Sequence, residues 1–225
     1  IIRLMNANSG KSLHMSPCAS SGRALIIALF ALAALLGGLI VARGLLEDSV
    51  QLQAASVYPE TRLLEPFELS DAQGNAFTEA DLQGNLTLLF FGFTNCPDIC
   101  PDTLGVLAEA MDKLDAMRVE SKPHVVFVSV DPGRDAGRTM QDYVAYFDPD
   151  FTAVTGDDPA LNRLTSQVGA MFARNSPDEN GYYAVDHSGM IVIVDDQGRM
   201  IGRFPTASSA DAIAADLFAL SRARG

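Results

Sequence analysis

Histidine and cysteine are scarce in this chain, and tryptophan is absent. The 225 residues include three histidines, three cysteines and no tryptophan. Three cysteines are too few for a small secreted fold held together by disulfides, so that class is excluded. Basic residues are also few, with 16 Lys and Arg against 28 Asp and Glu. A chain this acidic binds nucleic acid poorly, and we expect no nucleic-acid partner.

The longest apolar run covers residues 24–42. It contains 19 uncharged, mostly apolar residues between Arg23 and Arg43. A helix of this length extends about 28 Å, close to the thickness of the hydrocarbon core of a bilayer. We therefore predict one transmembrane anchor over 24–42. A cleaved secretory signal is the alternative, but its apolar region would be shorter and would end in a small-residue cleavage site.

The charges before this segment predict its orientation. Arg3, Lys11 and Arg23 precede it and no acidic residue does, so the positive-inside rule keeps the N-terminus in the cytoplasm. The N-terminal stretch lacks the arginine-rich amphipathic pattern of a transit peptide. We expect a single-pass protein of a bacterial inner membrane with its main domain in the periplasm. The mitochondrial inner membrane is the alternative.

These boundaries divide the chain into four parts. We expect a cytoplasmic tail over 1–23, the anchor over 24–42, a spacer over 43–60 and an exported domain over 61–225. The residues after Arg43 carry 12 basic and 28 acidic side chains, a formal net charge of −16. Such a charge favours a well-hydrated, soluble surface.

The exported part has the pattern of a three-layer α/β fold. Residues 67–85 predict a short hairpin with a turn at Gly74–Asn75, and 86–93 predict a buried strand. Apolar residues spaced three and four apart then predict a helix from about Pro101. Further strands are expected at 124–132, 151–156, 182–188, 190–196 and 199–204, and further helices at 138–147, 158–172 and 208–223.

Cys96 and Cys100 lie between the predicted strand 86–93 and the helix that follows. Open α/β folds form their sites at this edge of the sheet, and a helix N-terminus favours thiolate over thiol. A spacing of four places both sulfurs on one face of a helical turn. The pair therefore suits a shared metal ion or a reversible disulfide. A permanent structural disulfide would gain little, because the loop that it closes is so short.

The third ligand follows by elimination among the histidines. His14 precedes the anchor, as Cys18 does, and His124 begins a strand at the edge opposite the expected site. His187 remains, at the tip of a hairpin predicted between 182–188 and 190–196. Its ring is expected to project there from a tight turn at Ser188–Gly189.

The donor set predicts the metal. Two thiolates and one imidazole form a soft, low-coordinate set that suits Cu(I) and can hold Cu(II), whereas structural zinc would require a fourth protein ligand. Asp98, Asp186 and Met190 are candidates for a fourth ligand, and none is compelling. The sequence therefore favours copper over zinc.

Three sequence elements, in this order, resemble the Sco/SenC family of membrane-anchored copper proteins: FGFTNCPDICPDTL, VSVDPGRDAGR and YAVDHSGMIVIVDDQGR. The resemblance covers nearly all of residues 60–222. It implies a thioredoxin-like three-layer sandwich with an inserted hairpin behind the N-terminal anchor. In that family two cysteines and one histidine bind a single copper ion, which assigns Cys96, Cys100 and His187 as the metal ligands.

The same resemblance implies a partner and further residues. The family delivers copper to, or reduces the cysteines of, the binuclear copper centre of cytochrome c oxidase subunit II. That subunit or another exported copper protein is the expected partner. Asp131, Asp135 and Asp186 match acidic positions near the family's site. Ala136 and Gly137 replace the family's usual threonine and proline, so the start of the next helix is expected to differ.

Two functions of different classes are left open. The preferred one is a copper metallochaperone, which is not an enzyme and passes its metal to a partner by stepwise thiolate exchange. The alternative is a thiol–disulfide oxidoreductase in which Cys96 attacks a partner disulfide and Cys100 resolves it. A peroxiredoxin-like function is ranked last, because it gives no role to Cys100 or His187.

Overall fold

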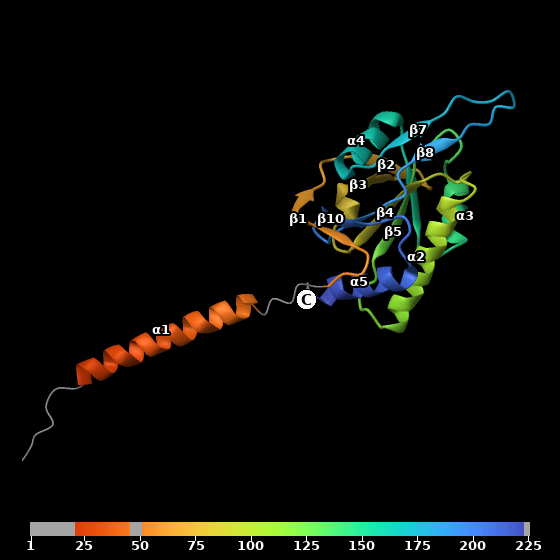
Figure 1. The fold of residues 1–225 in the computed structure, drawn as a ribbon. Coiled ribbons are helices and arrows are strands. Elements are labelled where there is room, and N and C mark those ends of the chain that lie inside the picture. The colour runs from red at the N-terminus through yellow and green to blue at the C-terminus, as the bar shows by residue number, and fades with distance from the viewer. Residues whose placement is uncertain (1–20, 46–50, 223–225) are drawn as a thin grey trace, which may run out of the picture. The chain divides into compact units, whose positions relative to one another are not determined.

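The structure, a computed structural model, describes residues 21–45 and 51–222 (Figure 1). The chain divides after Ser49 into two compact units. The described part of the first unit is one α-helix, α1 (Ser21–Leu45). Residues 1–20 of the predicted tail and 46–50 of the predicted spacer lie outside the described residues.

Helix α1 covers the segment predicted to cross a membrane. The described apolar side chains along it are exposed, with Leu25, Phe30 and Leu39 each more than half accessible. Within the described residues, however, no helix is both long enough and apolar enough to span a bilayer. The predicted helix is present, whereas the transmembrane span over 24–42 is not confirmed.

The second unit is built on a mixed eight-stranded sheet, in the order β1-β10-β9-β4-β5-β6-β2-β3. Strand β4 pairs in parallel with β5, and β5 in parallel with β6, while the other neighbouring strands are antiparallel. As predicted from its apolar run, β4 is buried along its whole length near the centre of the sheet. The strands are β1 (Ser56–Leu63), β2 (Glu68–Asp71), β3 (Ala76–Thr78), β4 (Thr87–Gly92), β5 (His124–Ser129), β6 (Thr152–Thr155), β9 (Ile191–Val194) and β10 (Arg199–Phe204).

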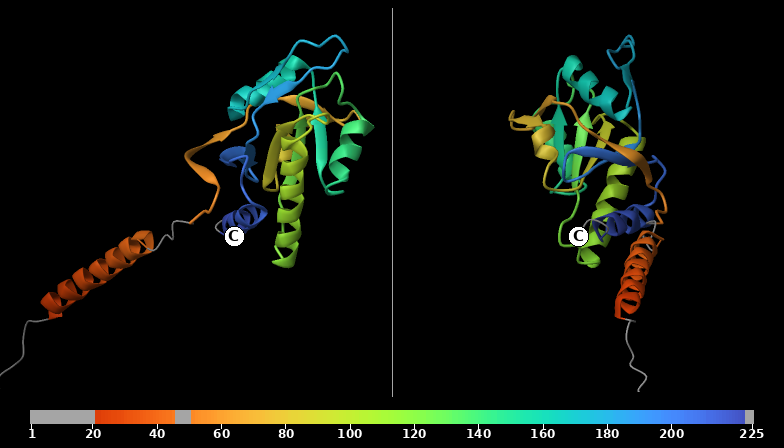
Figure 2. Two further views of the ribbon diagram at one scale, coloured as in Figure 1. Left: turned by 45° about the vertical axis from the view of Figure 1, so that its right-hand side comes forward. Right: turned by 90° about the vertical axis from the view of Figure 1, so that its left-hand side faces the viewer.

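Both faces of the sheet are covered, which gives the predicted three layers (Figure 2). Leu88 and Phe90 of β4 pack with α2 (Ile99–Ala116), α3 (Arg138–Ala145) and α5 (Ala210–Arg222). Neighbouring strand residues point to opposite faces. Leu89 and Phe91 therefore belong to the other core, which is covered by α4 (Asp158–Val168), the β2–β3 hairpin and the 3-10 helix η1 (Glu79–Leu82).

Two glycines determine where helices begin and end. Gly169 adopts a left-handed conformation (φ 71°) and ends α4 at Val168, as glycine commonly does at helix C-termini. The predicted helix over 158–172 is therefore too long. Gly137 has φ 53° and precedes α3 without any side-chain cap. This is the position where the sequence departs from the family pattern.

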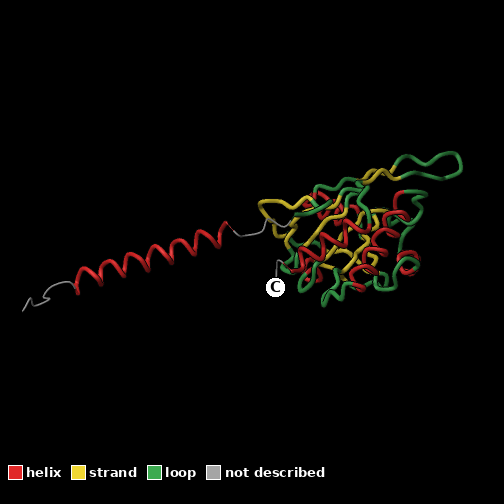
Figure 3. Tube along the Cα trace, turned by 60° about the horizontal axis from the view of Figure 1, so that its bottom comes forward, coloured by secondary structure: helices red, strands yellow, loops and turns green. Residues whose placement is uncertain are grey.

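A separate two-stranded ribbon replaces the predicted hairpin around Ser188–Gly189. Strand β7 (Phe172–Arg174) pairs with β8 (Val185–His187), so that Phe172 lies opposite His187. The ribbon and its connecting loop extend away from the sheet (Figure 3). The predicted pairing of 182–188 with 190–196 is wrong, because β9 is buried in the main sheet between β4 and β10.

The folded domain begins before the predicted boundary at residue 61. Strand β1 pairs with β10 from Ser56 onward, and the second compact unit begins at Val50. Asp216 of α5 is buried and accepts hydrogen bonds from the backbone N–H groups of 53, 54 and 55, at 2.6, 2.8 and 2.7 Å. These residues are thus part of the domain, and the predicted spacer over 43–60 is too long.

We predict that Asp216→Ala lowers the free energy of unfolding of the second unit by about 3 kcal/mol, because three N–H groups lose a buried charged acceptor. Urea unfolding of residues 50–225 measures this change. Asp211→Ala is the matched control on the same helix, since its exposed carboxylate only pairs with Lys113, and it should change stability little. Equal losses in the two variants would contradict the prediction.

Candidate metal centre

Cys96 and Cys100 lie at the junction between the end of β4 and the start of α2. Cys96 is in the connecting loop and is half-buried, and Cys100 is buried in the first turn of the helix. The Cys96 N–H donates to the Phe93 carbonyl at 3.2 Å, which turns the loop back toward the strand. A Cβ on Gly92 would lie 2.7 Å from Cys100 Sγ and 2.8 Å from the Phe127 ring. The strand therefore ends in glycine because the Cys100 thiol occupies that space.

His187 brings the third candidate ligand from the end of β8. Its Nε2 lies 3.4 Å from Cys100 Sγ, and its Nδ1 lies 3.3 Å from the Ser188 carbonyl oxygen. The imidazole stands edge-on to the rings of Phe93 and Phe90, with centroids 5.7 and 6.4 Å away. The ring is half-buried and does not project from a hairpin tip as predicted.

The structure brings together the three side chains that the sequence singled out. The ligand atoms of Cys96, Cys100 and His187 all lie within 4.8 Å of one another, close enough for one ion to contact all three. Among the described residues, Asp98 and Asp186 do not join this group. The thioether sulfur of Met190 lies 3.8 Å from Arg203 Nη1. The donor set is thus two thiols and one imidazole.

Burial disfavours the charged forms of two of these side chains, Cys100 and His187. It raises the pKa of the Cys100 thiol, and the nearby Cys96 and Asp135 act in the same direction. Burial also lowers the pKa of His187 from its ordinary value, which favours the neutral imidazole that can bind a metal. The helix N-terminus was expected to favour a thiolate at Cys100, whereas burial acts in the opposite direction. A metal must therefore displace the Cys100 proton in order to bind.

Two of the acidic residues expected near the ligands are fully buried in the loop between β5 and α3. Asp135 accepts hydrogen bonds from the Thr94 N–H and the Ser129 hydroxyl, both at 2.7 Å, and so fixes the loop that carries Cys96. Asp131 contacts the ribbon that carries His187 through Tyr183 (2.7 Å). The third acidic residue, Asp186, is exposed on β8.

The sequence analysis did not identify Gly92, Phe93 or Tyr183 as parts of the centre. A glycine at the end of a fully buried strand is a signal that could have indicated Gly92, because such a position often allows close approach of another group. Phe93 and Tyr183 carry no comparable signal. Their roles depend on which distant segments pack beside them.

Comparisons with known proteins agree with this description. Residues 56–222 match the family model described as SCO1/SenC. A SCO2-like protein of Rickettsia felis is 35% identical over 144 residues, which cover 64% of this chain and 69% of that protein. A putative copper-binding protein of Stutzerimonas stutzeri is 33% identical over 180 residues, which cover 80% and 85%.

Similar solved structures include two with copper bound. ScoI of Arabidopsis thaliana is 30% identical with a TM-score of 0.65, and the match covers 72% of this chain and 99% of that one. ScoI of Bradyrhizobium japonicum is 34% identical with a TM-score of 0.60, covering 69% and 98%. These matches confirm the thioredoxin-like α/β fold, and their copper agrees with the metal that the donor set predicts. Because the family model matches residues 56–222, which are most of this chain, the chain belongs to the SCO1/SenC family.

Proposed function

We propose that this protein is a copper metallochaperone for cytochrome c oxidase assembly, with Cys96, Cys100 and His187 as its copper ligands. The observation that carries the proposal is the convergence of these three ligand atoms, from two separate segments, within 4.8 Å. Thiolate and imidazole are the soft donors that Cu(I) prefers, and such a set can also hold Cu(II). The copper-bound ScoI structures support copper over zinc.

A delivery role is supported by the accessibility of one side of the centre. Cys96 is only half-buried, and a shallow surface hollow beside His187 is lined by Met171, Phe172 and Ala173. Thiolates of a partner could therefore displace the ligands one at a time, beginning with Cys96. The partner that family membership favours is the binuclear copper centre of cytochrome c oxidase subunit II, and another exported copper protein is the alternative.

A thiol–disulfide oxidoreductase is the second candidate function, because the same two free cysteines lie close together and Cys96 is the less buried of the two. In this case Cys96 attacks a partner disulfide, and Cys100 then attacks the mixed disulfide and releases the reduced partner. Oxidation of the pair would also remove both thiolate ligands and release copper. The two functions differ in what they require of His187.

We predict that His187→Ala weakens Cu(I) binding by the reduced protein at least about a hundredfold, since outer-sphere changes alone typically cause ten- to hundredfold losses. Thiol–disulfide exchange should remain within about twofold of the wild type, because imidazole is not one of the exchanging sulfurs. Competition titration against a chromophoric Cu(I) chelator measures the affinity, and reaction with a small aromatic disulfide measures exchange.

His124→Ala is the matched control for this experiment. His124 is also half-buried, but its ring contacts Thr152 Oγ1 (2.8 Å) at the start of β5, away from the cysteines. Its replacement should leave copper affinity unchanged. Weak copper binding in the wild type, equal to that of His187→Ala and accompanied by full exchange activity, would contradict the chaperone proposal and favour the oxidoreductase.

Copper affinity should fall as the pH falls, because protons compete with the metal for the thiolates, above all at Cys100 with its raised pKa. Burial lowers the pKa of His187, so near pH 6.5 its imidazole competes for protons less than an ordinary histidine would. From about pH 8 to about pH 6.5, log affinity should therefore fall with nearly the same slope in wild type and His187→Ala. A steeper wild-type slope near pH 6.5 would contradict the lowered histidine pKa.

Attachment to a membrane through α1 is also part of the proposal, with the main domain in a bacterial periplasm, or in mitochondria at the inner membrane. It is supported by the exposed apolar side chains along α1 and by the basic residues before it. The full chain should sediment with membranes and resist alkaline carbonate extraction, whereas a variant without residues 1–45 should remain in the supernatant. Release of the full chain by carbonate would contradict this part.

A further inference from the structure

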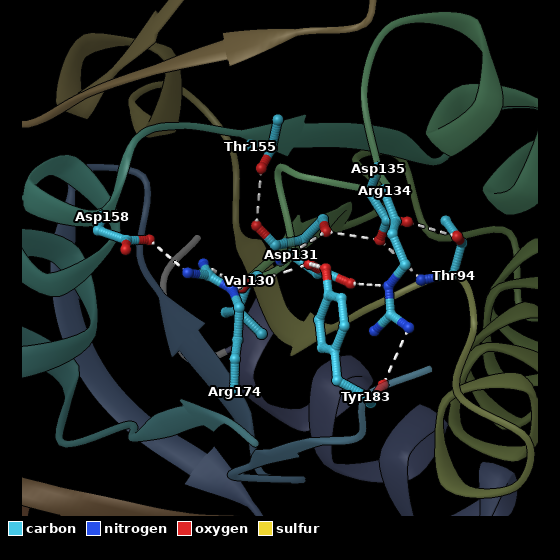
Figure 4. Close-up of polar contacts among 10 residues, drawn as sticks. Thr94, Val130, Asp131, Arg134, Asp135, Thr155, Asp158, Arg174 and Tyr183 are labelled. Carbon is cyan, nitrogen blue, oxygen red and sulfur yellow. Dashed lines mark hydrogen bonds and ion pairs between the residues drawn. The ribbon is translucent and has the colours of Figure 1, made fainter. Parts of the chain in front are cut away.

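One loop, residues 130–137, contacts both segments that carry the candidate metal ligands (Figure 4). On one side, Asp135 accepts hydrogen bonds from the backbone N–H and the hydroxyl of Thr94, two residues before Cys96. On the other side, Asp131 accepts a hydrogen bond from the Tyr183 hydroxyl at 2.7 Å. Tyr183 precedes His187 by four residues. The loop thus joins the cysteine side of the centre to the histidine side.

The contact with Tyr183 involves its hydroxyl, its ring and its backbone. Arg134 pairs with the Asp131 carboxylate that accepts the hydroxyl. The same guanidinium lies 3.7 Å from the centroid of the Tyr183 ring, and its Nη1 donates to the Tyr183 carbonyl at 2.9 Å. Cation–π contact and charge-assisted hydrogen bonds are among the stronger polar interactions of proteins. Together they fix the entrance to β8.

A second arginine holds the neighbouring strand of the ribbon. Arg174 of β7 donates through Nε and Nη2 to the Val130 carbonyl, at 3.0 and 2.6 Å, and its Nη1 pairs with Asp158 at 2.7 Å. Arg174 lies opposite Val185 in the β7–β8 pairing. Both strands of the ribbon are therefore attached to the same loop.

The ribbon depends on such side-chain contacts because no strand pairing attaches it to the main sheet. Within the described part of the chain, β7 and β8 pair only with each other. Val185 is buried in a hydrophobic core, with Phe172 and Tyr183 packed against it. Apolar packing is non-directional, whereas a hydrogen bond to a fully buried carboxylate fixes one position. The Tyr183–Asp131 hydrogen bond is thus a directional restraint from this loop, four residues before His187.

We propose that Tyr183, held by Asp131 and Arg134, is a positioning residue that keeps His187 Nε2 directed at Cys100 and thereby raises the affinity of the metal centre. This inference rests on the proposed three-ligand copper site. A second contact supports it, since Arg134 also lies 5.5 Å from the centroid of Phe93, whose ring stands edge-on to His187.

The test is a double-mutant cycle on the full chain in detergent, with Tyr183→Phe and His187→Ala alone and combined. Phenylalanine keeps the ring over which Arg134 lies and removes only the hydroxyl. Tyr183→Phe alone should weaken Cu(I) binding about tenfold, a loss typical of groups that orient a metal ligand. In the His187→Ala background it should cause no further loss, because the residue that it positions is gone.

Tyr182→Phe is the matched control, since the neighbouring tyrosine is 52% exposed, and it should leave the affinity unchanged. Thiol–disulfide exchange in Tyr183→Phe should equal that of the wild type, because the cysteine loop is held by Asp135 instead. Thermal unfolding of each variant verifies that the protein is folded.

Two results would overturn the inference while the copper site stands. One is an unchanged affinity in Tyr183→Phe, and the other is the same tenfold loss in both backgrounds, which would indicate a general structural role. An unchanged affinity in His187→Ala would instead overturn the proposed copper site itself. The failures of the two proposals are therefore distinguishable in one set of four proteins.

Discussion

Two buried carboxylates in a single loop hold together segments that no strand pairing joins. Asp131 and Asp135 are both fully buried, and a carboxylate in such surroundings must be matched by donors or cations. Asp135 finds its donors on Thr94 and Ser129, and Asp131 on Arg134 and Tyr183. Because Thr94 lies in the cysteine loop and Tyr183 precedes β8 in the ribbon, the hydrogen bonds that these carboxylates accept also restrain the distance between the two sides of the metal centre.

The centre itself combines opposing electrostatic effects. The N-terminus of α2 favours a thiolate at Cys100, while burial raises the pKa of that thiol. A metal that binds must therefore displace the proton of the Cys100 thiol, so metal binding is coupled to proton release. A buried thiol without metal is also a poor nucleophile. The more accessible Cys96 is therefore the sulfur expected to meet an incoming partner first.

Local patterns were sufficient to predict the central features of the fold. The apolar run of β4 and the helical spacing of α2 belong to single elements, and the cysteine pair lies at their junction, so neighbouring residues carry the information. His187 followed by elimination, because so few histidines were available. Gly169 is a recognisable helix stop, but the helix predicted over 158–172 ran through it, whereas α4 ends at Val168.

The errors arose where distant segments compete for the same partner. By local pattern alone, residues 182–188 could pair with 190–196. In the structure β9 pairs instead with β4 and β10, where it is buried on both faces. β8 is then left to pair with β7. Likewise, β1 is almost wholly exposed, so no alternation of apolar residues distinguished it from a spacer. Its place is fixed by pairing with β10 and by the Asp216 carboxylate beside it.

This arrangement divides the proposed metal ligands between a rigid and a less constrained part of the molecule. Cys100 is packed within the core that joins α2 to the sheet, and it can move only if that core opens. His187 is carried by a ribbon outside the main sheet, whose position depends on a few side-chain contacts. Displacement of the ribbon would remove the imidazole while leaving the two sulfurs in place. In the proposed transfer, withdrawal of the histidine would break the contacts of the ribbon with the loop 130–137 and the packing of Val185 in its core, so the affinity of the centre depends in part on how firmly that loop holds the ribbon.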